Sequence, residues 1–241
     1  MQHKTPQLKD MYEKDIRLQE SSQIRDLQAI QNNIAKQVVL RDSTADVSFF
    51  AGVDQAFYDN NVLSYAVVVN KDMRLVDEAS TVMKTTMPYV AGLLFYREGP
   101  AIIDVFGKLQ KRPDVLLVDA CGINHYRFAG LASHVGVILD LPTIGVSKRP
   151  LCGEHTEPVS VGDHSVLRFH GRAVGFVLKT WKDSRPIFIS PGHRISLNRS
   201  LDVVQRCLRG HKLPEPLRLA HAKANTLKRM LCAIGELRAV S

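Results

Sequence analysis

The chain of 241 residues has few cysteines and no long apolar segment, and both absences exclude classes of protein. Its four cysteines form no Cys-x-x-Cys pair and have no regular spacing; they are Cys121, Cys152, Cys207 and Cys232. This pattern indicates neither a cysteine zinc site nor a disulfide framework, so we expect reduced thiols. No apolar stretch is long enough to cross a bilayer, and the first ten residues lack the hydrophobic core of a signal peptide. We therefore expect a cytoplasmic protein with no membrane partner.

Acidic residues are also comparatively few, since 24 of them stand against 32 lysines and arginines, which gives a net charge of +8. Such a surface attracts polyanions, and nucleic acid is the simplest partner to expect. The alternative is that the charge serves solubility alone. There is no internal repeat and no low-complexity segment, and a chain of this length favours one large domain with appendages. We expect it to act as a monomer.

An amphipathic helix is predicted at the N-terminal end. Residues 7–41 are polar, lack glycine and carry apolar side chains every three to four residues, namely Ile24, Leu27, Ile30, Ile34 and Val38. This spacing is typical of one narrow helical face that docks along the side of a protein. We interpret residues 1–45 as a helical extension and residues 46–241 as the main domain.

The main domain begins with three strand-like runs, at residues 49–57, 62–69 and 74–83. Short polar turns separate them, so they are expected to form an antiparallel meander. Next come a helix with Pro100 in its first turn, a strand over 115–119, a helix over 130–139 and a strand over 142–146. A loose stretch over 152–172 precedes strands at 173–180 and 186–190 and two final helices. Alternating helices and strands predict parallel pairing, and the whole order is that of a ribonuclease H-like α/β fold, with a mixed central sheet flanked by helices.

Two acids stand in strand-like apolar segments, where packing does not explain them. Asp54 lies within residues 49–57, and Asp119 ends the run over 114–119. An ionised carboxylate loses several kcal/mol of hydration in such a place unless a cation or hydrogen-bond donors meet it. In the predicted order the two strands lie side by side, and two adjacent carboxylates ligating through oxygen select magnesium or manganese. Glu98, near the start of the next helix, is placed to join them; its alternative role is to favour the helix N-terminus.

Six blocks in the same order resemble endonuclease V, the inosine-specific nuclease family. They are residues 52–54, 87–98, 116–125, 142–148, 190–196 and 213–221. Together they span nearly the whole chain except its ends, which is far more specific than any single motif. The resemblance implies a Mg²⁺-dependent enzyme, with Mn²⁺ as a substitute, that acts on deoxyinosine in DNA during repair. It implies hydrolysis of the second phosphodiester bond 3′ to the inosine.

The resemblance also implies roles for individual residues. Asp54, Glu98 and Asp119 match the acidic metal-binding triad, and His221 matches a further position near the metal. Lys148 matches the lysine that contacts the scissile phosphate. Residues matching the wedge that enters the duplex and the surround of the extruded base are Pro88, Tyr89, Val90, Ala91, Gly92, Leu94, Gly122 and His125. The chain departs from the family pattern at Ala120 and Cys121, where glycine and histidine or asparagine are usual, and this bears on base specificity.

Several alternatives stay open at this stage. Tyr89 is also explained as an ordinary loop aromatic, and His125 as a hydrogen-bonded structural residue. His221 is also explained as a surface helix residue, and Lys148 with Arg149 as a solvated basic pair. For the whole chain, the rivals are an inosine-specific endoribonuclease, a structure-selective nuclease like the incision domain of nucleotide-excision repair, and a binding module of the same fold without catalysis. The sequence does not separate DNA from RNA as substrate.

Overall fold

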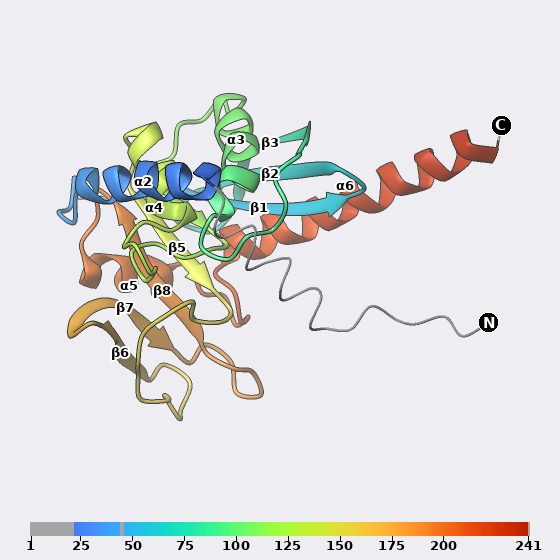
Figure 1. The fold of residues 1–241 in the computed structure, drawn as a ribbon. Helices are drawn as coiled ribbons and strands as arrows, with labels where there is room; N and C mark the ends of the chain where they lie inside the picture. Colours follow the sequence, from blue (N-terminus) through green and yellow to red (C-terminus); the bar gives the residue numbers. More distant parts are fainter. Residues whose placement is uncertain (1–21, 44–45, 241) are drawn as a thin grey trace, which may run out of the picture.

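The computed structural model describes residues 22–43 and 46–240 (Figure 1). The first helix within them is α2, Ser22–Gln37, so the predicted N-terminal helix is confirmed over that range and its residues 7–21 lie outside the described residues. Ile24, from the predicted apolar stripe, is buried. The helix packs beside α4, and the Tyr96 hydroxyl donates a hydrogen bond of 2.6 Å to the carbonyl of Leu27.

One mixed eight-stranded sheet forms the centre of the molecule, in the order β3-β2-β1-β4-β5-β8-β7-β6. Its strands are β1 Phe50–Tyr58, β2 Asn61–Val69, β3 Leu75–Lys84, β4 Val115–Val118, β5 Thr143–Ser147, β6 His164–Phe169, β7 Arg172–Leu178 and β8 Ile187–His193. The first three strands pair antiparallel, and β1, β4 and β5 pair parallel. This confirms the predicted meander, the parallel centre and the ribonuclease H-like α/β class.

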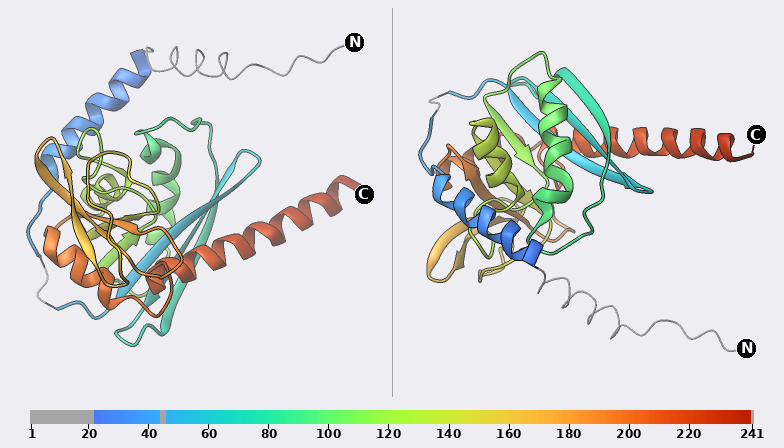
Figure 2. Two further views of the ribbon diagram at one scale, coloured as in Figure 1. Left: turned by 90° about the horizontal axis from the view of Figure 1, so that it is seen from below. Right: turned by 45° about the horizontal axis from the view of Figure 1, so that its top comes forward.

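Helices cover both faces of the sheet (Figures 1 and 2). On one face lie α3, Leu94–Gly107, and α4, Leu131–Leu139, whose apolar side chains share a core with the inward residues Ala51, Val53 and Leu116. On the other face lie α5, Leu197–Arg206, and the start of α6, Glu215–Val240. The far end of α6 extends away from the sheet (Figure 2). Within the described part of the chain, no helix is both long and apolar enough to cross a membrane.

Two expectations about local structure are wrong. Pro100 lies inside α3 and not in its first turn, because the turn at Val90 to Leu93 already starts the helix at Leu94. The exposed face of α3 tolerates the proline, whose missing N–H leaves one helical hydrogen bond unmade. The stretch predicted to be loose contains β6, which pairs antiparallel with β7. Leu167 is the one buried side chain of β6, so the strand has no apolar run to announce it.

Gly52 explains how α6 comes close to the sheet. A Cβ atom at this glycine would lie 2.3 Å from the backbone carbon and oxygen of Pro216 and 2.7 Å from the nitrogen of Leu217. Real Cβ contacts are never so short, so only glycine allows the start of α6 to cross β1 directly. Asp54 stands two residues further along β1 and therefore faces the same side as Gly52. The close approach brings α6 against Asp54.

Candidate active site

Asp54 and Asp119 meet at the centre of the sheet, as the sequence predicts. Strands β1 and β4 are parallel neighbours, with Val53 paired to Val118, and each acid follows its paired valine. Asp54 is buried within β1, and Asp119 is half-buried just beyond the end of β4. The hydrogen-bonded register of two strands thus fixes their spacing.

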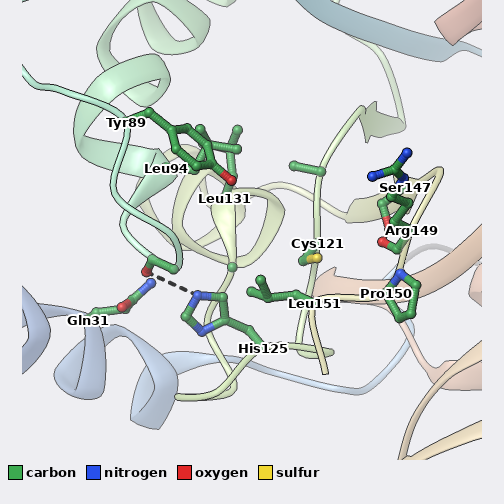
Figure 3. A pocket seen from close by; sticks show the side chains of 13 residues that line it. Gln31, Tyr89, Leu94, Cys121, His125, Leu131, Ser147, Arg149, Pro150 and Leu151 are labelled. Carbon is green, nitrogen blue, oxygen red and sulfur yellow. Dashed lines mark hydrogen bonds between the residues drawn. The ribbon is translucent and has the colours of Figure 1, made fainter. Parts of the chain in front are cut away.

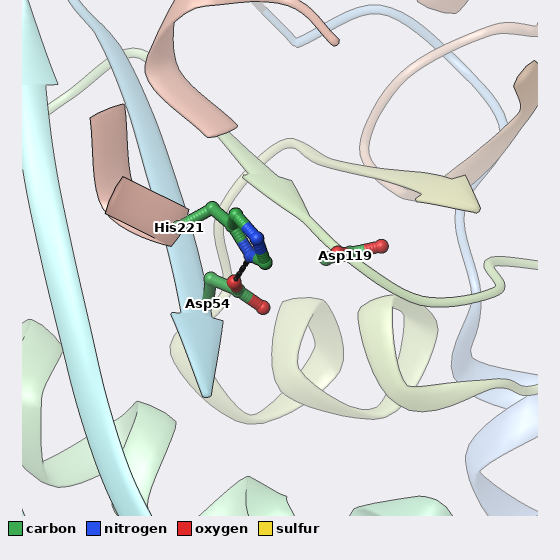
Figure 4. Close-up of side chains that lie close together, drawn as sticks. All are labelled: Asp54, Asp119 and His221. Carbon is green, nitrogen blue, oxygen red and sulfur yellow. Dashed lines mark hydrogen bonds and ion pairs between the residues drawn. The ribbon is translucent and has the colours of Figure 1, made fainter. Parts of the chain in front are cut away.

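His221, from the second turn of α6, completes a cluster with the two acids (Figure 4). Its Nδ1 lies 2.5 Å from Oδ2 of Asp54. One ligand atom from each of Asp54, Asp119 and His221 lies within 4.8 Å of the other two. The Asn225 side-chain amide is 3.2 Å from Nε2 of His221 and donates to the His221 carbonyl, which restrains the imidazole one turn of helix away.

The surroundings of Asp54 and Glu98 disfavour the ionised form of both carboxyl groups. Burial and the neighbouring Asp119 carboxylate raise the pKa of Asp54, while the hydrogen bond from His221 acts in the opposite direction. Burial, followed by the charge of Asp54, raises the pKa of Glu98 to about 8, with Asp119 adding to the effect. Glu98 lies in the second turn of α3 and is buried, so the explanation that it only favours the helix N-terminus does not describe it. It faces the two aspartates but is not one of the three clustered ligand groups.

Lys148 places a cation at the edge of the cluster. It follows the last residue of β5, and its Nζ lies 3.0 Å from Oδ2 of Asp119. Half of its side chain is exposed, so the ammonium can reach a ligand that approaches from solvent. The lysine is therefore part of the site, whereas the neighbouring Arg149 is an exposed residue that lines the adjoining pocket.

A pocket of about 280 Å³ adjoins the cluster (Figure 3). Its lining residues are Gln31, Tyr89, Gly92, Leu94, Ala120, Cys121, His125, Gly130, Leu131, Ser147, Arg149, Pro150 and Leu151. The walls are mostly apolar with a few polar groups, as in sites that enclose a flat organic ligand. Tyr89, 67% exposed, stands at the rim. Ala120 and Ser147 directly adjoin Asp119 and Lys148 in sequence, so the pocket and the acids share two strand ends.

A hydrogen-bonded clamp fixes one wall of this pocket. The carbonyl oxygen of Gly92 accepts from His125 Nε2 at 3.1 Å and from Arg127 Nη2 at 2.9 Å. Arg127 Nε donates to Gln31 Oε1, and Gln31 Nε2 donates to the carbonyl of Ala129, both at 2.6 Å. Helix α2 thus reaches the pocket wall through Gln31. The clamp connects three distant segments of sequence.

The clamp decides what His125 can do. Its Nδ1 accepts from the backbone N–H of Arg127, so the ring proton is on Nε2, which donates to Gly92. Burial, with the nearby Arg127 cation, lowers the pKa of His125 to about 4. A neutral imidazole with both nitrogens engaged positions a loop and does not transfer protons. The explanation of His125 as a hydrogen-bonded residue therefore agrees with the geometry, and its place in the pocket wall agrees as well.

The remaining predicted wedge and pocket residues lie as follows. Gly92 has φ of +79°, a left-handed torsion that favours glycine, and it turns the chain between the wedge and α3. Pro88 and Ala91 are exposed and Val90 is half-buried beside Tyr89, so the four residues form one protruding loop. Gly122 is buried against the carbonyl oxygens of Ser190 and Pro191 and is not among the residues that line the pocket.

Seven lining residues were not predicted, namely Gln31, Gly130, Leu131, Ser147, Arg149, Pro150 and Leu151. Gln31 is a polar residue on a polar helix and gives no sequence signal, and residues 149–151 lie in a loop. The departure at Ala120 proves mild, because this residue is not among those of positive φ and its backbone needs no glycine. The methyl group of Ala120 takes up space at the wall and so makes the pocket narrower than glycine would.

The family model for endonuclease V matches residues 32–222. The chain belongs to the endonuclease V family. Endonuclease V of Rippkaea orientalis is 39% identical over 212 residues, which make up 86% of this chain and 93% of that relative. The crystal structure of the human endonuclease V catalytic domain superposes with a TM-score of 0.82 at 29% identity, covering 88% of this chain and 98% of that one.

A further endonuclease V structure, from Ciona intestinalis, contains a 24-mer DNA with an inosine followed by a ribo-adenosine. It is similar to this chain with a TM-score of 0.75 at 22% identity, covering 88% of this chain and 100% of that one, a likeness that shows the fold. Membership of the endonuclease V family confirms the predicted recognition and makes the protein a nuclease that hydrolyses phosphodiester bonds. The structure-selective nuclease and the non-catalytic module are thereby set aside.

Proposed function

We propose that this endonuclease V recognises deoxyinosine in DNA and hydrolyses the second phosphodiester bond 3′ to it, as a DNA repair enzyme. The observation that carries the proposal is the juxtaposition of two features at one sheet edge. The cluster of Asp54, Asp119 and His221 offers ligand atoms within 4.8 Å of one another, and it adjoins the pocket at whose rim Tyr89 stands. One feature suits bond hydrolysis, and the other suits an extruded base.

The cluster fits a hard divalent cation. Two carboxylates supply oxygen ligands, and burial, followed by like charge, raises the pKa values of Asp54 and Glu98. A cation would offset both the burial and the like charge, and oxygen-rich ligand sets favour Mg²⁺, with Mn²⁺ as a substitute. Asp54, Asp119 and His221 would hold it, with Glu98 next to them. When bound, the ion supplies activation of a water nucleophile and stabilisation of negative charge at the phosphate.

The surrounding residues supply the rest of the chemistry. Lys148, held at 3.0 Å from Asp119, sets a positive charge where the phosphate gains negative charge, and its exposed side chain can follow the substrate. Glu98, next to Asp54 and Asp119, adds a further carboxylate to the site. Asn225 holds the His221 ring in one orientation.

The pocket and the wedge supply recognition. Extruding a base costs a few kcal/mol of stacking, and the exposed ring of Tyr89 beside Pro88, Val90 and Ala91 can replace the lost stack. The clamp on Gly92 holds the wedge loop and the pocket wall in one position before the substrate arrives, which lowers the cost of binding. Hypoxanthine carries an oxygen where adenine carries an amino group, so uncharged donors in the wall can distinguish the two bases.

A nicking assay tests the proposal. DNA duplexes that each contain one inosine, one uracil, one abasic site or one mismatch are incubated with Mg²⁺, and an RNA that contains inosine is assayed in parallel. We expect a nick at the second bond 3′ to inosine, and loss of that nick with retained binding in Asp54→Ala and Asp119→Ala. Faster cleavage of the RNA would favour the endoribonuclease alternative. Equal cleavage of all the DNA substrates would contradict inosine recognition.

The cytoplasmic location, the monomeric state and the division of the chain at residue 45 belong to the same proposal. Gln31 belongs to the predicted extension and lines the pocket, so helix α2 of that extension contributes to the catalytic domain.

A further inference from the structure

A basic loop that contains an exposed tryptophan lies at the same sheet edge as the active site, outside the chemistry described above. The loop, residues 179–185, joins β7 to β8 (Figure 1). It carries the three cations Lys179, Lys182 and Arg185 and one acid, Asp183. Trp181, the one tryptophan of the chain, is 48% exposed. A single exposed apolar side chain is common on a protein surface, so it is the combination of the indole with three cations that distinguishes this loop.

Strand directions place this loop beside Lys148. Strands β5 and β7 both pair antiparallel with β8, so they run parallel to each other and end at the same edge of the sheet. Ser147 and Val177 are both paired with Phe188, which puts them in one row across three strands. Two strand spacings separate them, or about 10 Å. Lys148 follows the first strand end, and the basic loop follows the second.

The loop is tied to the segment that leads into α6. The hydroxyl of Thr180 donates to the carbonyl of Lys212 at 2.7 Å, and Lys179 Nζ donates to the carbonyl of Ser184 at 2.7 Å. Lys212 precedes the helix that carries His221. Burial lowers the pKa of Lys212, and repulsion from Lys148, Arg185 and Lys179 lowers it further. These four cations therefore form one electropositive field that begins at the active site.

Lys148 pairs with Asp119, whereas the cations farther from the active site have no acidic partner in the described part of the chain. Within residues 22–43 and 46–240, Lys179, Lys182, Arg185 and Lys212 form no ion pair with a carboxylate. Other surface cations differ, since Lys71, Lys108 and Lys223 each pair with an acid. Unpaired cations in a row bind the regularly spaced charges of a polynucleotide, and aromatic rings beside them stack on its bases.

We infer that residues 179–185 and Lys212 form a second nucleic-acid contact, which binds the phosphates of the strand that leaves the active site and stacks Trp181 on one of its unpaired bases. The inference rests on the proposed function, because that function places the cleaved phosphate of the strand next to Lys148. The distance of about 10 Å from the end of β5 corresponds to about three nucleotides, at a helical rise of about 3.4 Å for each. The contact is independent of the base that the pocket accepts.

Binding of single-stranded inosine oligonucleotides in EDTA tests the inference, with the full chain throughout. We expect Trp181→Ala to weaken binding by about 5- to 100-fold and Trp181→Phe to restore most of it, because stacking is lost and regained. The double variant Lys182→Ala/Arg185→Ala should reduce the slope of log affinity against log salt by about 1.4, whereas Trp181→Ala should leave the slope unchanged. Arg112→Ala is the matched control, since this exposed cation lies before β4, at the opposite edge of the sheet.

Truncation of the oligonucleotide locates the contact. Two shorter substrates keep the inosine and the cleaved bond but lose either the 5′ or the 3′ flank. We expect the effect of Trp181→Ala to vanish with one truncation and to persist with the other. If Trp181→Ala binds the long substrate as tightly as Arg112→Ala does, or if both truncations leave its effect intact, the inference is wrong. Nicking of the long substrate by the wild-type protein with Mg²⁺ tests the proposed function separately from this inference.

Discussion

Gly52→Ala should damage the active site through the backbone alone. The new methyl carbon would lie 2.3 Å from the carbonyl carbon and oxygen of Pro216, where ordinary contacts are about 3.4 Å or longer, so α6 must withdraw from β1 by about 1 Å. His221 moves with the helix, away from the Asp54 oxygen that it now contacts at 2.5 Å. Overpacking of this kind costs about 1–3 kcal/mol of stability, and a 1 Å misplacement at a reacting centre costs about 100-fold in rate.

Two measurements on the same preparation test this prediction. Urea unfolding gives the loss of stability, and single-turnover nicking of an inosine oligonucleotide, at a temperature where circular dichroism shows the variant to be folded, gives the loss of rate. Gly107→Ala is the matched control, because a Cβ there meets no atom within 4 Å and should change neither quantity by much. Wild-type nicking by folded Gly52→Ala would refute the reasoning, since it would mean that the His221 position does not depend on the close crossing of α6 and β1.

Three further predictions concern polar groups that are buried or half-buried. In EDTA at about pH 7, Glu98→Gln should raise the free energy of unfolding, measured by urea titration, by up to about 3 kcal/mol. The reason is that the pKa of Glu98 is about 8 in the folded protein and 4.5 in the reference state, so the wild-type protein loses stability as pH rises between those values. The variant should also lose Mg²⁺-dependent nicking. Burial lowers the pKa of His134 to about 4 from 6.5, so the unfolded chain takes up the proton first and stability falls as pH drops through that window. His134→Phe should remove up to about 1.4 kcal/mol per pH unit from that slope in urea titrations, and an unchanged slope would contradict the assignment. Arg127→Met, which removes one donor to Gly92 and one to Gln31, should raise KM for inosine DNA more than it lowers kcat. An equal loss of binding to an oligonucleotide without inosine would instead indicate general unfolding.

The sequence predicts the centre of this protein well because the decisive residues break a local rule. Asp54 and Asp119 are acids in apolar strands, and the sheet order that follows from the alternation of elements brings those strands together. His221 and Lys148 came from the family resemblance and not from periodicity, and both lie beside the acids. The ends predicted for β1, β4 and β5 lie within one residue of those in the structure, so the cluster could be placed.

The pocket wall could not be predicted in the same way. Gln31, Arg127 and Gly92 are distant in sequence, and their hydrogen bonds depend on how α2 docks against the body of the fold. Strand β6 was missed because its side chains are mostly exposed, so burial gives it no period to detect. The position of Pro100 was wrong because a proline suits both the first turn and an exposed interior site of a helix, and only the turn before Leu94 decides between them.

The most direct test of the central claim is a calorimetric titration of Mg²⁺ into the protein without nucleic acid. The account predicts saturable binding to the wild-type chain, and loss of that binding in Asp119→Asn, which removes one carboxylate of the cluster while keeping its shape. Gly107→Ala should bind as the wild type does. Unchanged Mg²⁺ binding by Asp119→Asn would contradict the claim, because the cation would then be held by other residues.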